Sequence, residues 1–138
     1  MEEVKDDNRC FACGKDNPIG LKLDFYIDGD YTVSNLNFQK NYDGWKGMVH
    51  GGILSTVLDE IMVKSANNRG FTCVTAELNV RYKKPCLSGK DYILRGRVIE
   101  IRKSVVVTEG GIIDGEGNTI ASGSGKLFII DPEKHKLK

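Results

Sequence analysis

The feature that most constrains the fold is a single helical repeat that begins with two glycines. From Gly51 to Met62 the sequence reads GGILSTVLDEIM, with apolar residues three and four positions apart, the pattern of a helix with one buried face. Two adjacent acids, Asp59 and Glu60, flank the apolar face. Glycine is unfavourable in a helix. The pair of glycines at the helix start therefore indicates either close packing of the helix on a sheet or the approach of a ligand to the first turn.

Segments of alternating or β-branched residues surround this helix. Two precede it, and four follow the Asn67, Asn68 and Gly70 that are expected to end the helix after about Ser65. The predicted strands are 21–27, 31–38, 73–85, 91–102, 104–114 and 119–130. One long helix and about six antiparallel strands predict an α+β fold in which the sheet curls around the helix. No linker divides the chain, so we expect one domain, 1–138, with an ordered core of about 10–131.

The charge of the chain excludes several classes of partner. Twenty basic and 19 acidic side chains give a net charge of +1, which offers no electrostatic footprint for nucleic acid. No apolar run approaches the roughly 18–20 residues of a membrane span. The first nine residues, MEEVKDDNR, lack the features of a secretory signal. We therefore expect a cytoplasmic protein that binds neither nucleic acid nor membranes.

Four cysteines raise the question of a metal. Cys10 and Cys13 form a C-x-x-C pair, which can supply half of a zinc site, but Cys73 and Cys86 do not form a matching pair. A thioredoxin-like role is disfavoured because no strand precedes the pair. We therefore expect no metal site, with structural zinc as the alternative.

Three further segments carry a resemblance to a known family. NYDGWKGMVHGG spans 41–52 and leads into the helix, where an acid lies nine positions after the histidine; TAELNVRYKKP spans 75–85, and CFACGKDNPIGL spans 10–21. Together they resemble the hotdog-fold acyl-CoA thioesterases, in the branch similar to phenylacetate-pathway thioesterases. The resemblance implies a curved antiparallel sheet wrapped around one central helix, and dimers with active sites at the interface.

The resemblance also implies a set of catalytic residues. It places the oxyanion donor at the backbone N–H of Gly51, with Gly52 supporting the turn. It places the catalytic acid at Asp59, as a nucleophile or as a general base for water. It assigns Thr75 to positioning water or bonding the acid. Periodicity alone does not choose between Asp59 and Glu60, which lie roughly 100° apart on the helix; Glu60 is expected at the surface, paired with Lys64.

The remaining expected site residues would bind or shape the substrate. His50 is expected to fix the turn before the helix rather than act as a base, and Trp45 to wall the acyl pocket. Asn79 either lines the site or is structural. Some relatives have an asparagine six residues before the histidine, where this chain has Gly44. That departure leaves the placement of the water open.

These features predict an acyl-CoA thioesterase that releases a free acid and coenzyme A. No cofactor is expected, because coenzyme A is part of the substrate. The expected assembly is a homodimer, with a homotetramer as the alternative. A non-catalytic acyl-CoA-binding sensor is the second interpretation, and the presence of Asp59 counts against it. A hotdog dehydratase is disfavoured because His50 lies in the turn.

Overall fold

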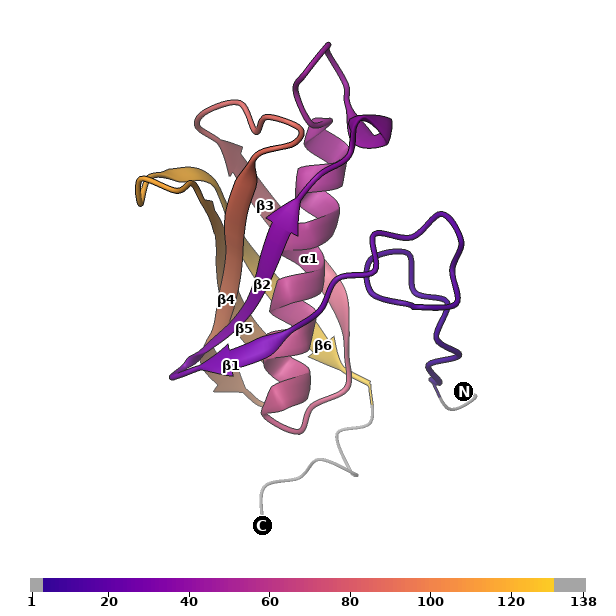
Figure 1. The fold of residues 1–138 in the computed structure, drawn as a ribbon. Coiled ribbons are helices and arrows are strands. Elements are labelled where there is room, and N and C mark those ends of the chain that lie inside the picture. Colours follow the sequence, from indigo (N-terminus) through magenta and orange to yellow (C-terminus); the bar gives the residue numbers. More distant parts are fainter. Residues whose placement is uncertain (1–3, 131–138) are drawn as a thin grey trace.

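A computed structural model describes residues 4–130, in which one long helix lies in the hollow of a single antiparallel sheet (Figure 1). The helix α1 is Gly51–Asn68, and a 3-10 turn, η1, is Lys40–Tyr42. The strands are β1 Tyr26–Asp28, β2 Tyr31–Asn37, β3 Cys73–Tyr82, β4 Asp91–Arg102, β5 Val105–Ile113 and β6 Thr119–Ile129, in the order β1-β2-β4-β5-β6-β3. The predicted α+β class and the hotdog architecture are confirmed.

The apolar face of α1 forms the centre of the core. Val57, Leu58, Ile61 and Met62 have no exposed surface, and together they face β4, β5 and β6. Burial of each such side chain contributes on the order of 1.5–3 kcal/mol. The helical periodicity of the sequence therefore predicted the face that packs on the sheet.

A row of glycines lets the helix approach the sheet closely. Gly96, Gly110 and Gly123 are cross-strand neighbours on β4, β5 and β6. A Cβ on Gly96 would lie 3.0 Å from a methyl carbon of Ile61, and one on Gly110 would lie 3.2 Å from the same carbon. Side chains in this row would push α1 away from the sheet. The glycines of the sheet therefore account for the close helix–sheet packing. The two glycines at the start of the helix need a different explanation.

The first strand is shorter than predicted. Residues 21–25 were expected to belong to it, but the backbone N–H groups of Leu21 and Leu23 donate instead to the carbonyls of Phe11 and Ala12. Lys22 between them has a φ of +54°, which breaks the extended conformation. The alternation in LKLDF therefore reflects a segment paired with the N-terminal loop rather than with the sheet.

Two other boundaries differ by a few residues from the prediction. The helix continues through Asn67 and ends at Asn68. Gly70 follows it at a φ of +91°, where glycine avoids the strain of a left-handed residue. The third predicted strand ends at Tyr82, because the N–H groups of Lys83 and Lys84 both turn to the carbonyl of Ile120.

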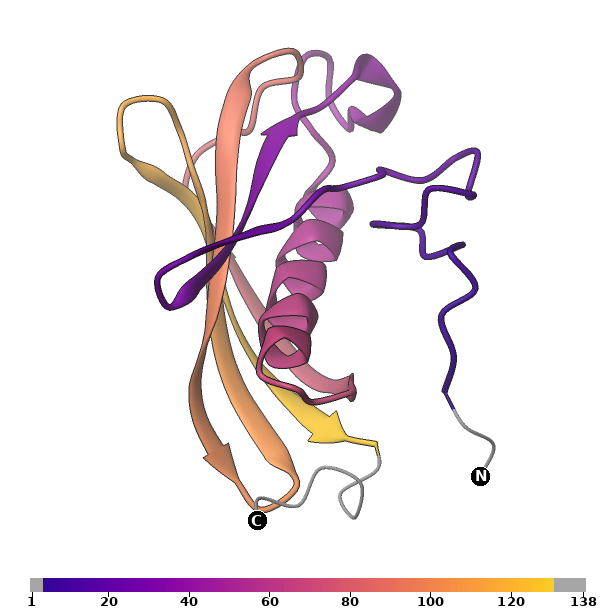
Figure 2. The same ribbon diagram turned by 60° about the horizontal axis from the view of Figure 1, so that its bottom comes forward.

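The N-terminal segment lies across α1 from the sheet (Figure 2). Ala12 in this loop is buried in the main core cluster, which fixes the loop against the helix. Within residues 4–130, no helix has the length and apolarity needed to cross a membrane. Residue 131, at the end of the predicted ordered core, and the second histidine, His135, lie outside the described residues.

Candidate functional site

The start of α1 is held in place by backbone hydrogen bonds from two loops. The N–H of His50 donates to the carbonyl of Tyr42 over 2.8 Å, and the N–H of Val49 donates to the carbonyl of Cys86 over 2.8 Å. Gly44 packs against the same turn, because a Cβ there would lie 3.3 Å from the Cα of His50. The loop before the helix is therefore tied down on both sides, as a rigid binding site requires.

His50 caps the helix with its side chain. Its Nδ1 accepts a hydrogen bond of 2.9 Å from the N–H of Gly52, one of the helix-start donors that lack an intrahelical partner. A Cβ on Gly52 would lie 3.1 Å from this Nδ1, so the glycine makes room for the cap. The imidazole lone pair is thus engaged by the backbone, which agrees with the expected turn-fixing role of His50.

The N–H of Gly51 is left free by this arrangement. Among residues 4–130 no acceptor contacts it, and the first turn contains no acidic residue. The positive end of the helix dipole therefore acts there without a local counter-charge. A free N–H at this position can donate to a carbonyl oxygen that gains negative charge.

A tyrosine that the sequence analysis did not select braces the same turn. The hydroxyl of Tyr82 donates to the carbonyl of Gly51 over 2.9 Å. Because its proton is used in this bond, the 2.5 Å contact with the Ser55 hydroxyl is donated by Ser55. The sequence spacing could have pointed to Ser55, because Gly51, Ser55 and Asp59 lie four residues apart along one flank of the helix.

Asp59 and Thr75 meet at the far end of this flank. The hydroxyl of Thr75 donates to Oδ1 of Asp59 over 2.5 Å, so the residue pair implied by the resemblance is in direct contact. Among the described residues, Oδ2 of Asp59 has no hydrogen-bond partner. Asp59 is only half-buried. One carboxylate oxygen is therefore fixed by the strand, and the other is open to a ligand.

A β-bulge in β3 separates Thr75 from Asn79. The register shifts between Thr75 and Glu77, so residues after the bulge change faces. Thr75 pairs with the fully buried Leu127 on the helix side, whereas Asn79 pairs with the exposed Ser124 on the outer side. The structure therefore places Asn79 on the face opposite Asp59, beside a cavity of about 410 Å³.

The bulge also explains why Tyr82 was missed. In a regular strand, the even-numbered Tyr82 would lie on the opposite face of the sheet from the odd-numbered Thr75. The extra residue returns Tyr82 to the helix side, where it reaches Gly51 and Ser55. Trp45, the expected pocket wall, is 81% exposed at the tip of its loop. In the described chain it is not brought together with Asp59.

The expected oxyanion donor and the expected acid do not meet within one chain. Gly51 and Asp59 are eight positions apart on α1, which corresponds to about 12 Å along the axis. One thioester carbonyl cannot reach both groups of the same helix. The chain therefore presents two half-sites on one flank, with β3 as the sheet edge beside them.

Glu60 is not the surface residue that was expected. It is half-buried beneath the N-terminal loop, and the thiol of Cys10 lies 3.0 Å from its Oε2. Burial, together with the hydrogen bond and charge of Glu60, raises the pKa of the Cys13 thiol. The predicted Glu60–Lys64 pair was wrong, because the loop that covers Glu60 comes from a distant part of the sequence.

A protein-family model matches the part of the chain that contains the candidate site. The model described as "Thioesterase superfamily" matches residues 46–121, a segment that contains Gly51, Asp59 and Thr75. Human acyl-coenzyme A thioesterase 13 is 24% identical over 95 residues, which covers 67% of this chain and 68% of the relative. Mouse acyl-coenzyme A thioesterase THEM4 is 30% identical over 104 residues, covering 75% of this chain and 45% of the relative.

Solved structures show the same fold. The thioesterase superfamily protein RHA08564 aligns with a TM-score of 0.81 and 24% identity, over 88% of this chain and 63% of its own. PaaI of Escherichia coli aligns with a TM-score of 0.73 and 21% identity over 80% of both chains. The protein smu.793 of Streptococcus mutans, solved with acetyl CoA bound, aligns with a TM-score of 0.72 and 18% identity over 78% of this chain and 87% of its own.

Proposed function

Because the chain belongs to the thioesterase superfamily, we propose that it hydrolyses an acyl-CoA thioester to a free acid and coenzyme A. One observation carries the proposal: Asp59 is oriented by Thr75 on the same helix flank that ends in the free N–H of Gly51. A thioester hydrolase needs an oxyanion donor and a group that attacks or activates water. The curated relatives named acyl-coenzyme A thioesterases support this substrate class.

The proposed reaction balances with water alone. In one route Asp59 takes a proton from water as the water oxygen bonds to the acyl carbon, and it passes this proton to the sulfur as the carbon–sulfur bond breaks to release the coenzyme A thiol. In the other route Oδ2 of Asp59 bonds to the acyl carbon and coenzyme A leaves as its thiolate. Water then hydrolyses the resulting anhydride, which restores the Asp59 carboxylate and supplies the proton that the thiolate takes up. In both routes the Gly51 N–H donates to the oxygen that becomes negative. No cofactor enters either route, and coenzyme A is part of the substrate.

We propose that a second copy of the chain completes each site. β3 has ten residues and pairs only with β6 among the described strands. An open edge of this length invites pairing with another strand. A two-fold axis perpendicular to the sheet at this edge would pair two β3 strands antiparallel and place the two α1 helices antiparallel on the same face. The start of one helix then lies near the middle of the other. Gly51 of the partner subunit would thereby face Asp59, as a homodimer with interface sites requires; a tetramer would be built from such dimers.

The test is thiol release from a panel of acyl-CoAs by wild type and by Asp59→Asn. The panel runs from acetyl through aryl-acetyl to long acyl chains. Loss of the carboxylate should lower kcat by roughly 10²–10⁴-fold, with an unchanged circular dichroism spectrum. Glu77→Gln is the matched control, because Glu77 lies two residues past Thr75 on the outer side of the bulge. Equal release by Asp59→Asn and wild type would overturn the role of Asp59, and release no faster than the uncatalysed rate in both would support an acyl-CoA-binding sensor.

A further inference from the structure

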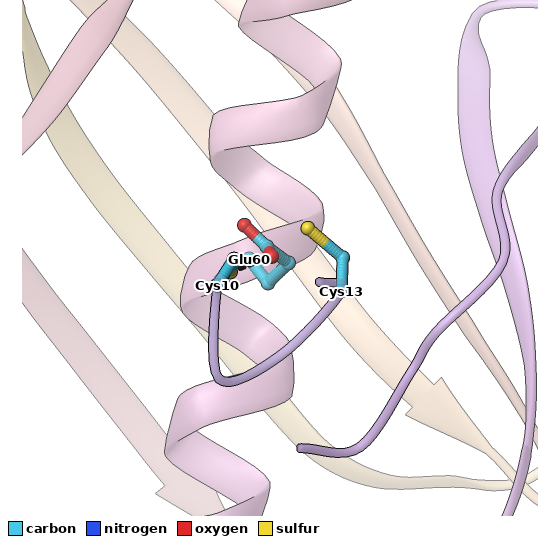
Figure 3. A group of neighbouring side chains, drawn as sticks. All are labelled: Cys10, Cys13 and Glu60. Atoms are coloured by element: carbon cyan, nitrogen blue, oxygen red, sulfur yellow. Dashed lines mark hydrogen bonds between the residues drawn. The ribbon is translucent and has the colours of Figure 1, made fainter. Parts of the chain in front are cut away.

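A cluster of two thiols and a carboxylate lies on the side of α1 away from β3. Cys10 and Cys13 project from the N-terminal loop on either side of Glu60 (Figure 3), and one ligand atom of each residue lies within 4.8 Å of the others. Glu60 follows Asp59 on the helix but points roughly 100° away from it. We propose that Cys10, Cys13 and Glu60 bind a zinc ion that joins the loop to the helix, independently of the proposed hydrolysis.

The donor atoms suit zinc in kind and in spacing. Zinc binds thiolate sulfur at about 2.3 Å and carboxylate oxygen at about 2.0–2.2 Å with tetrahedral geometry. Neighbouring ligand atoms then lie roughly 3.6–3.8 Å apart. The sulfur of Cys10 is 3.0 Å from Oε2 of Glu60, and all three ligand atoms lie within 4.8 Å. Small rotations of the three side chains would therefore bring their ligand atoms to coordination distance around one ion.

The loop holds the two cysteines in place through its own backbone. The N–H of Gly14 donates to the carbonyl of Cys10 over 2.8 Å, which closes the C-x-x-C turn. A Cβ on Gly14 would lie 2.4 Å from the backbone nitrogen of Cys10, so the tight turn requires glycine. Buried Ala12 anchors the turn in the core. Zinc would therefore bind to a largely preorganised pair of thiols.

The charge around the cluster also fits a divalent cation. Two thiolates and one carboxylate carry one negative charge more than zinc neutralises. The group has no fourth His, Cys, Asp or Glu ligand within residues 4–130, so water would complete the tetrahedron. Cys10, Cys13 and Glu60 are each only partly buried, so a chelator can reach the ion.

Metal content and cobalt substitution of the full chain provide the test. The protein is purified under reducing conditions, stripped with a chelator, and titrated with Zn²⁺ or Co²⁺. We expect one ion per chain and sulfur-to-cobalt charge-transfer bands. Cys10→Ser, Cys13→Ser and Glu60→Gln should each weaken zinc binding by more than roughly tenfold in a competition with a chromophoric chelator. Cys73→Ala is the matched control, because Cys73 is buried in another cluster, and it should bind as wild type does.

A second readout is thermal stability. Chelation should lower the Tm of the wild type, because an ion that binds only the folded chain stabilises it, and should leave the Tm of Cys10→Ser unchanged. Asp59→Asn should keep the ion while losing hydrolysis, which separates this site from the proposed active site. Substoichiometric zinc in the wild type, or wild-type affinity in all three ligand variants, would overturn the proposal. A Cys10–Cys13 disulfide that persists under reducing conditions would overturn it in favour of a redox pair.

Discussion

The hydroxyl of Thr75 donates a 2.5 Å hydrogen bond to Oδ1 of Asp59, and so joins the strand after the helix to the middle of the helix. A bulge directly follows Thr75, so the odd-numbered residues after it lie on the opposite face of the sheet. Thr75 is therefore the odd-numbered residue of this stretch that contacts Asp59. The carboxylate is thereby oriented by one oxygen while the other remains open. Four consequences of the site geometry, and one of the buried thiols, can be measured.

Removal of the Thr75 hydroxyl should impair hydrolysis without unfolding the protein. A hydrogen bond to a charged group contributes about 1.5–3 kcal/mol, which corresponds to a roughly 10- to 100-fold lower kcat/KM in Thr75→Val. Thr75→Ser keeps the donor and should restore most of the activity. If Thr75→Val and Thr75→Ser behave alike in steady-state kinetics, the hydroxyl does not orient the acid.

The helix cap makes a prediction about stability. His50→Ala removes the acceptor of the Gly52 N–H and should lower the free energy of unfolding by about 1 kcal/mol. His50→Asn supplies another good cap and should be close to wild type in denaturant unfolding. A greater loss of hydrolysis in His50→Asn than in Asp59→Asn would instead identify the imidazole as a base.

The buried thiols predict a loss of stability at alkaline pH. Burial raises the pKa of Cys73 and of Cys86 from 9.0 to about 11. The folded state therefore holds these protons more tightly than the unfolded state, so stability is full below pH 9.0 and falls as pH rises toward 11. By about pH 10 each thiol should account for roughly 1.4 kcal/mol of lost stability. Urea unfolding at about pH 8 and pH 10 checks this, and a Cys73→Ala/Cys86→Ala variant should lose less than wild type.

Much of the fold follows from local patterns in the sequence. The helix from Gly51 and the long strands at 91–102 and 119–130 were predicted because each has a clear period and a marked end. The Asp59–Thr75 contact came from the family resemblance, since periodicity alone could not select Asp59. These elements bury one face against a single core, so their patterns survive in the folded chain.

The features that sequence reasoning missed depend on non-local backbone pairing or on a one-residue register shift. The bulge after Thr75 reversed the face of Asn79 and brought Tyr82 to Gly51. Its segment, TAELNV, alternates without any glycine or proline to mark it. The loop that covers Glu60 lies 50 residues away in sequence, and no helical period reports such a contact.

The oxyanion role of Gly51 can be tested by deleting its N–H alone. Gly51 is the first helical residue, where proline is well tolerated because that N–H has no intrahelical partner. His50 has an extended ψ of 135°, as a residue before proline prefers. Gly51→Pro should lower kcat by roughly 10²–10³-fold while the Tm stays near that of wild type. Gly51→Ala keeps the donor, and its Cβ would lie 3.5 Å from the Tyr82 ring in ordinary contact; it should retain most activity.

Mixing two inactive variants distinguishes a shared site from a site within one chain. In a dimer of Asp59→Asn with Gly51→Pro, one interface site pairs both altered residues, and the other pairs an intact Asp59 with an intact Gly51. Random association gives half heterodimers, each with one intact site, so co-refolded equal amounts should recover about a quarter of wild-type activity. Either variant refolded alone is the control. If the mixture stays as inactive as the separate variants, although it forms dimers in light scattering, Gly51 and Asp59 do not act across the interface.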